Sequence, residues 1–163
     1  MEPDEIDLQL VAELQQDCKV SYSELGARVG LSAPSVLERV RKLEKAGIVT
    51  GYHALVDGRK LGLDVTAFVG VGFNFPRRIE AIEASMVVLP GVLECHHVTG
   101  QHTLLIKVKA RNTADLERLI SAIRSLEGVE STDTMVVLST QTERVALPID
   151  AALATRKGRR RKR

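Results

Sequence analysis

The spacing of apolar residues changes about one third of the way along the chain. Up to about residue 45 they recur at intervals of three and four, which places them on one face of an α-helix. Between residues 65 and 73, and again between 104 and 108, they alternate with other residues, which is typical of β-strands with one buried face. We therefore expect a helical segment followed by a segment of mixed helices and strands.

Capping residues predict three helices in the first third. Asp4 can cap the first helix, and Ser21 with Glu24 forms a capping box at the start of the second. Ser32 can cap a third helix, and Pro34 is tolerated in its first turn because N–H groups there have no intrahelical partner. Two short helices joined by a tight turn are typical of a helix-turn-helix, which places its second helix in the major groove of DNA.

The third predicted helix has one apolar face and one polar face. Val36, Val40 and Leu43 fall on one side of the helical wheel and are expected to face the core. The opposite side offers small polar groups in its first turn and cations further along, which suits contacts with base edges and with phosphates. The candidate DNA-binding residues are Ser32, Ala33, Pro34, Ser35, Glu38, Arg39, Arg41 and Lys42.

Two features of this region leave alternatives open. Glu38 could accept a hydrogen bond from a cytosine amino group, or it could orient Arg41 or Lys42. The segment Gly47–Tyr52 resembles a wing, so residues 1–52 are predicted to form a winged helix-turn-helix domain.

Residues 64–142 show strand and helix patterns in the order β-α-β-β-α-β, after a hinge at residues 53–63. This order predicts a ferredoxin-like sandwich of the α+β class, in which both helices cover one face of a four-stranded antiparallel sheet. The other face would carry Phe68, Gly70 and Leu105, and we expect it to pair with a second copy of the chain.

The formal net charge of +2 is unevenly distributed. Residues 143–163 form a C-terminal extension, and the last eight residues carry seven positive charges, so the other 155 residues carry a net charge of −5. We expect this basic tail to contact DNA phosphates, the alternative being a solubilising tail without a further function. Residues 1–51 hold nine acids and six bases, so tight DNA binding is expected to need several copies.

Composition also predicts the compartment. Cys18 and Cys95 are too few for a disulfide framework and are interpreted as reduced thiols. No apolar run approaches the ~18–20 residues that cross a bilayer, and the first residues lack the apolar region of a signal peptide. We expect a cytoplasmic protein associated with the nucleoid and without a membrane partner.

From about Asp4 to Thr142 the chain resembles the Lrp/AsnC (leucine-responsive, feast/famine) family of transcriptional regulators. The order and spacing of several segments carry the resemblance, namely DEIDLQLVAELQQD, VGLS followed by VLERVRKLEKAGIV, LGLDVTAFV, LPGVLECHHVTG and GVESTDTMVVL. The resemblance implies a homodimer that pairs through its C-terminal domains and assembles further into an octamer or a related ring. It also implies an amino acid, or a similar small molecule, bound between C-terminal domains.

The resemblance places an effector region in one loop and the last strand. Relatives often carry two acidic residues in this loop, in a Gly-Asp-x-Asp pattern, where this chain has Gln101 and Thr103. A carboxylate is the natural partner of an amino acid's ammonium group, so here backbone carbonyls, His102 or Asp133 would have to serve, or the effector differs or is absent. The matching residues are Thr99, Gly100, Gln101, His102, Thr103, Thr132, Asp133, Thr134 and Met135.

The chain offers no catalytic or metal-binding motif. Cys95 and His97 would share one face of a strand and His96 the other, which leaves too few ligands for a closed zinc site. Some haem-pathway decarboxylases are similar to this family, but no nucleophile triad, paired carboxylates or phosphate-binding loop is present. We expect no enzyme activity, no cofactor and no metal.

These observations predict a sequence-specific regulator that binds double-stranded DNA as an oligomer and is modulated by an amino acid. The alternative is an architectural, nucleoid-associated protein that coats DNA with little sequence preference and responds little or not at all to an effector.

Overall fold

The computed structural model describes residues 2–73 and 79–149. The chain divides into two compact units. One unit holds the residues up to Ala54 together with the chain from Thr142 onward, and the other holds Leu55–Gln141. The basic tail, residues 156–163, lies outside the described residues.

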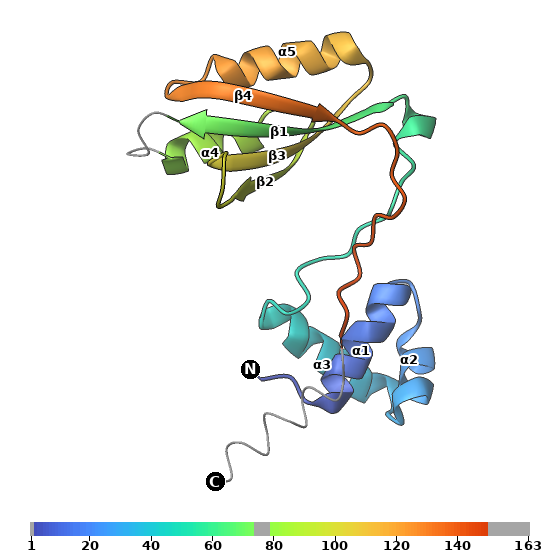
Figure 1. The fold of residues 1–163 in the computed structure, drawn as a ribbon. Coiled ribbons are helices and arrows are strands. Elements are labelled where there is room, and N and C mark those ends of the chain that lie inside the picture. Colours follow the sequence, from blue (N-terminus) through green and yellow to red (C-terminus); the bar gives the residue numbers. More distant parts are fainter. Residues whose placement is uncertain (1, 74–78, 150–163) are drawn as a thin grey trace. The chain divides into compact units, whose positions relative to one another are not determined.

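The first unit contains three helices that begin at the predicted caps (Figure 1). Helix α1 spans Glu5–Gln16, α2 spans Tyr22–Val29 and α3 spans Ala33–Lys45. At the start of α1 the Asp4 carboxylate accepts from the Asp7 N–H at 2.8 Å, and the Asp7 carboxylate accepts from the Asp4 N–H at 3.1 Å. Ser21 and Glu24 form the same reciprocal arrangement at the start of α2, which confirms the predicted capping box.

One apolar cluster holds the three helices together. Leu10, Leu25, Val36 and Val40 are fully buried, one or two from each helix, and Leu14 is nearly so. Burial of each such side chain contributes about 1.5–3 kcal/mol relative to exposure in water. The predicted inward face of α3 is confirmed, since Leu43 is fully buried as well.

Glycines shape the turn between α2 and α3. Gly30 ends α2 with φ of 71°, a left-handed conformation that L side chains rarely adopt. Gly26 lies within α2, where a Cβ would collide with the Leu31 carbonyl oxygen. The absence of a side chain at residue 26 therefore allows the turn to lie directly against α2.

The predicted wing is wrong as a β-structure, because the chain between α3 and Arg59 contains no strand. After α3, Gly47 adopts φ of 68°, and the Ile48 N–H donates to the Leu43 carbonyl at 3.0 Å in a Schellman turn. Ile48 and Val49 are half-buried, and the Tyr52 hydroxyl donates to Glu44 at 2.8 Å. The segment thus folds back on the end of α3.

The second unit has the predicted β-α-β-β-α-β order. A short 3₁₀ turn at Arg59–Leu61 precedes it. Its elements are β1 (Val65–Phe73), α4 (Ile79–Val87), β2 (Val92–His97), β3 (Leu104–Ala110), α5 (Thr113–Arg124) and β4 (Val129–Val136). The strands form one sheet in the order β2-β3-β1-β4, with every neighbouring pair antiparallel (Figure 1). This confirms the ferredoxin-like topology.

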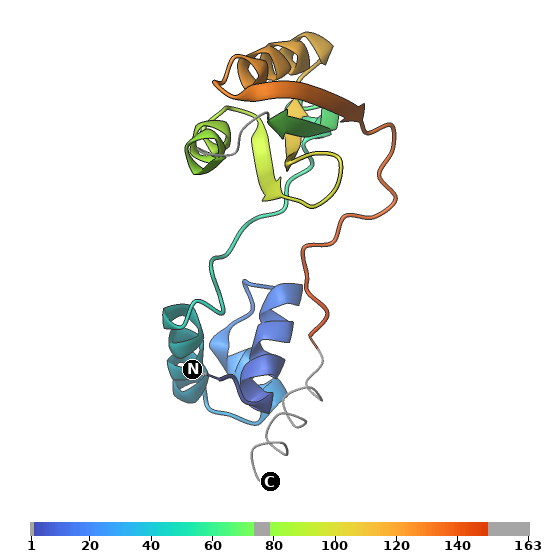
Figure 2. The same ribbon diagram turned by 60° about the vertical axis from the view of Figure 1, so that its left-hand side comes forward.

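Both helices of this unit pack on the same face of the sheet. The buried cluster joins β1 and β3 to Ile82 and Met86 of α4 and to Leu116, Leu119 and Ile123 of α5. Figure 2 shows the helices of this unit beside the sheet. The side chains that alternate with the buried ones therefore lie on the opposite face.

That opposite face, here called the open face, can be read from the strand register. Residues directly opposite each other in antiparallel strands share a face. One row across the sheet runs His96, Leu105, Gly70 and Asp133, and the next row runs Glu94, Lys107, Phe68 and Met135. The open face thus has Leu105, Phe68 and Lys107 on its central strands, Glu94 and His96 on the β2 edge, and Asp133 and Met135 on the β4 edge.

Candidate DNA-binding helix and effector region

The first turn of α3 presents small polar groups to solvent. Ser32, Pro34 and Ser35 are exposed and Ala33 is half-buried. The hydroxyl groups of Ser32 and Ser35 lie 2.9 Å apart, and Ser32 also accepts from the Ser35 N–H at 3.4 Å. A short, exposed first turn of this kind allows the backbone to approach the base edges in a major groove.

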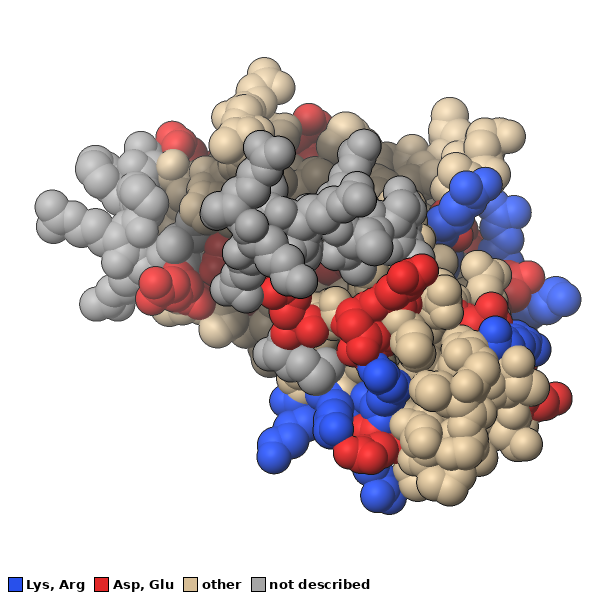
Figure 3. Space-filling view, turned by 90° about the horizontal axis from the view of Figure 1, so that it is seen from below, with Lys and Arg blue, Asp and Glu red and all other residues tan. Residues whose placement is uncertain are grey.

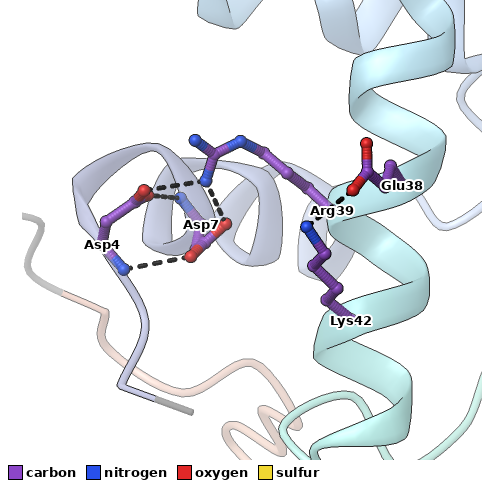
Figure 4. A network of polar contacts seen from close by, with 5 residues as sticks. All are labelled: Asp4, Asp7, Glu38, Arg39 and Lys42. Carbon is purple, nitrogen blue, oxygen red and sulfur yellow. Dashed lines mark hydrogen bonds and ion pairs between the residues drawn. The ribbon is translucent and has the colours of Figure 1, made fainter.

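Arg39 points towards α1 and links it to α3 (Figure 4). Its guanidinium donates to Asp7 at 2.7 Å and to Asp4 at 2.8 Å. These hydrogen bonds, the one to Asp4 foremost, raise the pKa of Arg39. Partial burial opposes the shift at Asp4, but the Asp7 N–H and the Arg39 guanidinium together lower the pKa of that carboxyl group.

The geometry of Arg39 disagrees with its interpretation as a phosphate contact. Both of its carboxylate partners belong to the cap of α1, and Asp7 is buried, so the arginine neutralises a charge inside the domain. From the sequence, Asp4 was expected to act as a cap only. The cap has a second function that the sequence did not reveal, which is to bind a cation from α3.

Glu38 and Lys42 form an ion pair along the exposed side of α3. Their charged atoms lie 2.7 Å apart, at the i, i+4 spacing that brings side chains together on a helix. The hydrogen bond from Lys42 lowers the pKa of Glu38. This arrangement agrees with the alternative in which Glu38 orients a neighbouring cation.

Arg41 and Lys45 are therefore the cations of α3 that remain for a partner. Both are exposed, and neither makes an ion pair with another residue that the structure describes. Figure 3 shows Lys and Arg side chains lying beside Asp and Glu side chains on the face in view, rather than one continuous basic surface. The positive charge that α3 offers to DNA is small.

The effector region is divided by β4, because successive residues of a strand point to opposite faces. Asp133 and Met135 are exposed on the open face, whereas Thr132 and Thr134 are half-buried on the side of α5. The structure therefore brings these four residues together along one strand, but not around one cavity.

On the open face, His102 lies over the backbone of β1. A Cβ at Gly70 would collide with the imidazole ring, so this glycine provides the space in which the ring lies. The His102 Nε2 atom is 3.5 Å from the Asp133 carboxylate. The loop before β3 is fixed beside them, because the Thr103 N–H donates to the Val71 carbonyl at 2.9 Å. Thr99, Gly100 and Gln101 are exposed.

On the α5 side, Thr132 and Thr134 line an open groove of about 390 Å³. The Arg124 guanidinium donates to the Thr132 hydroxyl at 2.7 Å and is itself exposed. Arg124 was not among the residues expected from the sequence, where its only signal was a cation in the last turn of a predicted helix. The groove is lined by Thr113, Leu116, Glu117, Ile120, Ser121, Arg124, Thr132 and Thr134.

The cysteine and histidines of β2 do not converge. The register confirms that Cys95 and His97 share the helix-covered face and that His96 lies on the open face, where it contacts Glu94 at 3.2 Å. Burial raises the pKa of the Cys95 thiol. No group of three or more potential metal ligands occurs within residues 2–73 and 79–149.

A helix-turn-helix joined to a ferredoxin-like domain defines a class of DNA-binding regulators, and comparison with known proteins identifies the family. Residues 4–44 match the AsnC-type helix-turn-helix domain, and residues 66–147 match the Lrp/AsnC ligand binding domain. The chain belongs to the Lrp/AsnC family of transcriptional regulators, which are DNA-binding proteins and not enzymes.

Individual relatives are similar over nearly their whole length. The leucine-responsive regulatory protein of Rhizobium meliloti is 37% identical over 86% of this chain and 90% of its own. The HTH-type transcriptional regulator FL11 of Pyrococcus horikoshii is 32% identical, covering 90% and 96%. A feast or famine regulatory protein of M. tuberculosis, solved with L-methionine, superimposes with a TM-score of 0.84 at 32% identity, covering 90% and 99%.

A second solved structure with an amino acid is also similar. The complex of a transcriptional regulator from Neisseria meningitidis with L-methionine gives a TM-score of 0.85 at 28% identity, covering 91% of this chain and 98% of that one. Within the part of this chain that the structure describes, no helix is long and apolar enough to cross a membrane.

Proposed function

We propose that this regulator reads a palindromic DNA site with the α3 helices of a dimer. The observation that carries the proposal is the exposed first turn of α3, in which Ser32, Pro34 and Ser35 face solvent. Arg41 lies further along the same helix and would contact a phosphate. Half-sites should lie about one helical turn of DNA apart, or a multiple of it, because the two reading helices of a dimer are fixed relative to each other. Such a protein acts where DNA is, in the cytoplasm.

The open face supports a dimer as the reading unit. Phe68 and Met135 lie side by side in one row, Leu105 lies in the next, and Met135 is 47% exposed in the isolated chain. A second copy would cover these apolar side chains together with Lys107 beside Phe68, and Glu94, which pairs with Lys107 at 3.1 Å, would lie on the edge strand β2. Further assembly into an octamer or a related ring would bring more than one α3 pair to the same DNA and raise the affinity by multivalency.

We infer that an amino acid modulates this assembly, as suggested by two similar regulators whose structures contain L-methionine. Gln101 and Thr103 are neutral, so Asp133 is the carboxylate of the effector region that can accept from an ammonium group. On the other side of β4, Arg124 with Thr132 and Thr134 forms a separate position that can bind a carboxylate. An effector that favours one assembly over another changes DNA affinity by linkage.

Binding to DNA from upstream of the protein's own gene tests whether the protein is a sequence-specific regulator. We expect at least a tenfold preference over a scrambled duplex at moderate salt, and Ser35→Ala should reduce this preference while leaving binding to scrambled DNA unchanged. Ser23→Ala, in the first turn of α2, serves as the matched control. Equal binding to both duplexes would eliminate the sequence-specific function.

The limited positive charge of α3 favours one second candidate, an architectural protein that coats DNA. Arg39 is bound to Asp4 and Asp7, and Lys42 is bound to Glu38. Such a protein would depend on the basic tail for nearly all of its affinity. Deletion of residues 156–163 separates the two functions, because a regulator keeps its site preference whereas a coating protein loses binding almost entirely.

A further inference from the structure

After β4 the chain returns to the helical unit, and one side chain of α1 bonds it there. The Leu147 N–H donates to Gln15 Oε1 at 2.6 Å, and Gln15 Nε2 donates to the Leu147 carbonyl at 3.2 Å. The Gln15 amide thus bonds both polar groups of one backbone residue, as a paired strand residue would. Figures 1 and 2 both show the end of the described chain beside α1. We call this pair of hydrogen bonds the clasp.

The clasp joins residues that are 132 positions apart, and it is polar in character. The Leu147 side chain is 71% exposed, so burial of apolar surface does not hold the residue in place. Both hydrogen bonds lie at the surface, where water can replace either partner, so their net contribution to stability is small. The clasp is therefore a reversible contact and not part of a core.

Without the clasp, one short stretch of chain connects the two units. It leaves the helical unit after Tyr52, whose hydroxyl donates to Glu44 at 2.8 Å. It reaches the sheet unit at Gly58, where a Cβ would collide with the Lys109 side chain. Residues 53–57 are exposed, and the six peptide steps from Tyr52 to Gly58 span at most about 20 Å. A single exposed linker of this kind leaves the attached unit free to turn.

With the clasp closed, a second stretch of chain connects the units. It leaves the sheet unit at Val137, whose N–H donates to the Thr66 carbonyl at 2.9 Å, and it ends at Leu147. Residues 138–146 are exposed, and the ten peptide steps from Val137 to Leu147 span at most about 35 Å. A unit that is held at two points has fewer orientations than a unit that is held at one.

Both connections leave the sheet unit at the same corner. Thr66 and Lys109 lie opposite each other in β1 and β3, and Lys109 Nζ donates to the Thr66 hydroxyl at 3.1 Å. Gly58 lies against the Lys109 side chain, and Val137 bonds to the Thr66 backbone. In the helical unit the connections end on different helices, the first beside α3 and the second on α1. The two connections together therefore resist rotation of the helical unit about its linker.

The clasp acts on the reading helix because α1 and α3 are held together. Side chains of both helices belong to one buried cluster. Arg39 of α3 also donates to Asp4 and Asp7 at the start of α1. Whatever limits the orientation of α1 therefore limits the orientation of α3.

We propose that the clasp is a reversible attachment that restricts the orientation of α3 and thereby selects the spacing of the two half-sites. With the clasp closed, the two α3 helices of a dimer fit half-sites at one spacing and on one face of the duplex. With the clasp open, each helical unit turns on its single linker and accepts other spacings, at a lower effective concentration. This inference rests on the proposed function, since it requires a dimer that reads two half-sites.

The clasp can be tested without DNA. Hydrogen exchange resolved to single amides should show protection of the Leu147 N–H in the full-length protein, and Gln15→Ala should remove it. Alanine preserves the helix, so α1 itself should stay protected. Gln16→Ala is the matched control, because it changes the same residue type one position along on the exposed side of α1. Equal exchange of the Leu147 N–H in all three proteins would overturn the clasp.

The effect of the clasp on orientation is also measurable without DNA. Spin labels at Lys45→Cys in α3 and Ala114→Cys in α5, both exposed positions, report the distance between the units. The background is Cys18→Ser, Cys95→Ser, and dilution with unlabelled protein restricts the signal to pairs within one chain. We expect Gln15→Ala to broaden the distribution of this distance. A distribution that is equally broad with and without Gln15 would overturn the restriction of orientation.

The selection of spacing is tested with duplexes that carry the two half-sites at their natural separation or with about 5 or about 10 added base pairs. Half a helical turn places one half-site on the opposite face of the duplex, so the full-length protein should bind the duplex with half a turn added at least about tenfold more weakly than the one with a full turn added. Gln15→Ala should reduce this ratio to about threefold or less, whereas Gln16→Ala should retain it. Equal ratios in all three proteins would overturn the clasp as the determinant of spacing.

A longer second connection separates the tether from a local effect on α1. Insertion of about six Gly and Ser residues after Leu138, in the exposed stretch, keeps the clasp and should reduce the ratio as Gln15→Ala does. A reduced ratio in Gln15→Ala but not in the insertion variant would overturn the tether. Absence of site preference in the full-length protein would instead contradict the proposed function, while hydrogen exchange and the spin-label distances would still decide whether the clasp restricts α3.

Discussion

The two units of this chain achieve stability in different ways. The helical unit has a contiguous cluster of five buried apolar residues and adds ion pairs and caps between its helices, whereas the cluster in the sheet unit has twelve. A domain of about 50 residues buries a smaller fraction of its surface than a larger one, so its core alone gives it only marginal stability. The ion pairs of the helical unit therefore stabilise its own fold. The sheet unit has its larger core on one face of the sheet, so the opposite face is available to a partner.

Truncation of one buried side chain in each core should show the largest difference in stability between the two units. Leu25→Ala and Ile106→Ala each remove a fully buried side chain, at a cost of about 2–5 kcal/mol in the free energy of unfolding. We expect Leu25→Ala to unfold the helical unit alone, and Ile106→Ala to lower the Tm of a sheet unit that stays folded. Hydrogen exchange of each unit measures both outcomes. If the sheet unit unfolded in Ile106→Ala while the helical unit stayed folded in Leu25→Ala, the sheet unit would be the less stable of the two.

The sequence predicted those two cores because each depends on local periodicity. The spacing of Val36, Val40 and Leu43 within one helix, and the alternation along β1, determine which side chains turn inward. The helix starts were predictable for the same reason, since Asp4, Ser21 and Ser32 each act within three residues of themselves.

Contacts between distant residues were not predictable in this way. A helical wheel describes Arg39 relative to its own helix, but its hydrogen bonds depend on where the cap of α1 comes to lie. The position of His102 over Gly70 and the contact of Gln15 with Leu147 likewise arise from tertiary packing. The resemblance grouped Thr132, Asp133, Thr134 and Met135 as one effector region, and neither their division by alternation along β4 nor the residues that face them from α5 were predicted.

A charge on the open face should have the next largest effect. Phe68→Glu places a carboxylate among apolar side chains that a second copy would cover, and we expect the dimer to weaken by about 30-fold or more, as for a central interface residue. Leu138→Glu is the control, because that residue is 92% exposed beyond β4. Light scattering over a dilution series gives the dimer Kd. A Phe68→Glu protein that dimerises normally would place the subunit interface elsewhere.

Removal of the cation between α1 and α3 should destabilise the helical unit by a smaller amount. Arg39→Ala leaves the buried Asp7 carboxylate without its guanidinium partner, which costs about 1–3 kcal/mol. Arg41→Ala, on the exposed side of the same helix, should change stability by less than about 0.5 kcal/mol. Urea unfolding of the helical unit compares the two. Equal stability of both variants would show that the network does not stabilise the fold.

The same network predicts a dependence on pH. Because the pKa of Asp4 is lowered in the folded state from an ordinary value of 3.8, its stabilising contribution is present above that value and is lost as the pH falls through the folded pKa. The difference in stability between wild type and Arg39→Ala should therefore be constant from pH 7 to pH 5 and should shrink below about pH 4. A difference that grows on acidification would contradict the assignment.

The smallest expected effect distinguishes the paired from the unpaired cations of α3. Arg41 makes no ion pair with a described residue, so Arg41→Ala should lower the salt slope of DNA binding by about 0.9 per protomer in contact with DNA. Lys42 must first leave Glu38, and because Lys42→Ala also frees that carboxylate to repel phosphate, it should weaken binding with a smaller change in counterion release. Fluorescence anisotropy measured over a range of salt concentrations gives both slopes. If Lys42→Ala lowered the slope as much as Arg41→Ala, the ion pair would not persist on DNA, and α3 would offer more charge than the free protein indicates.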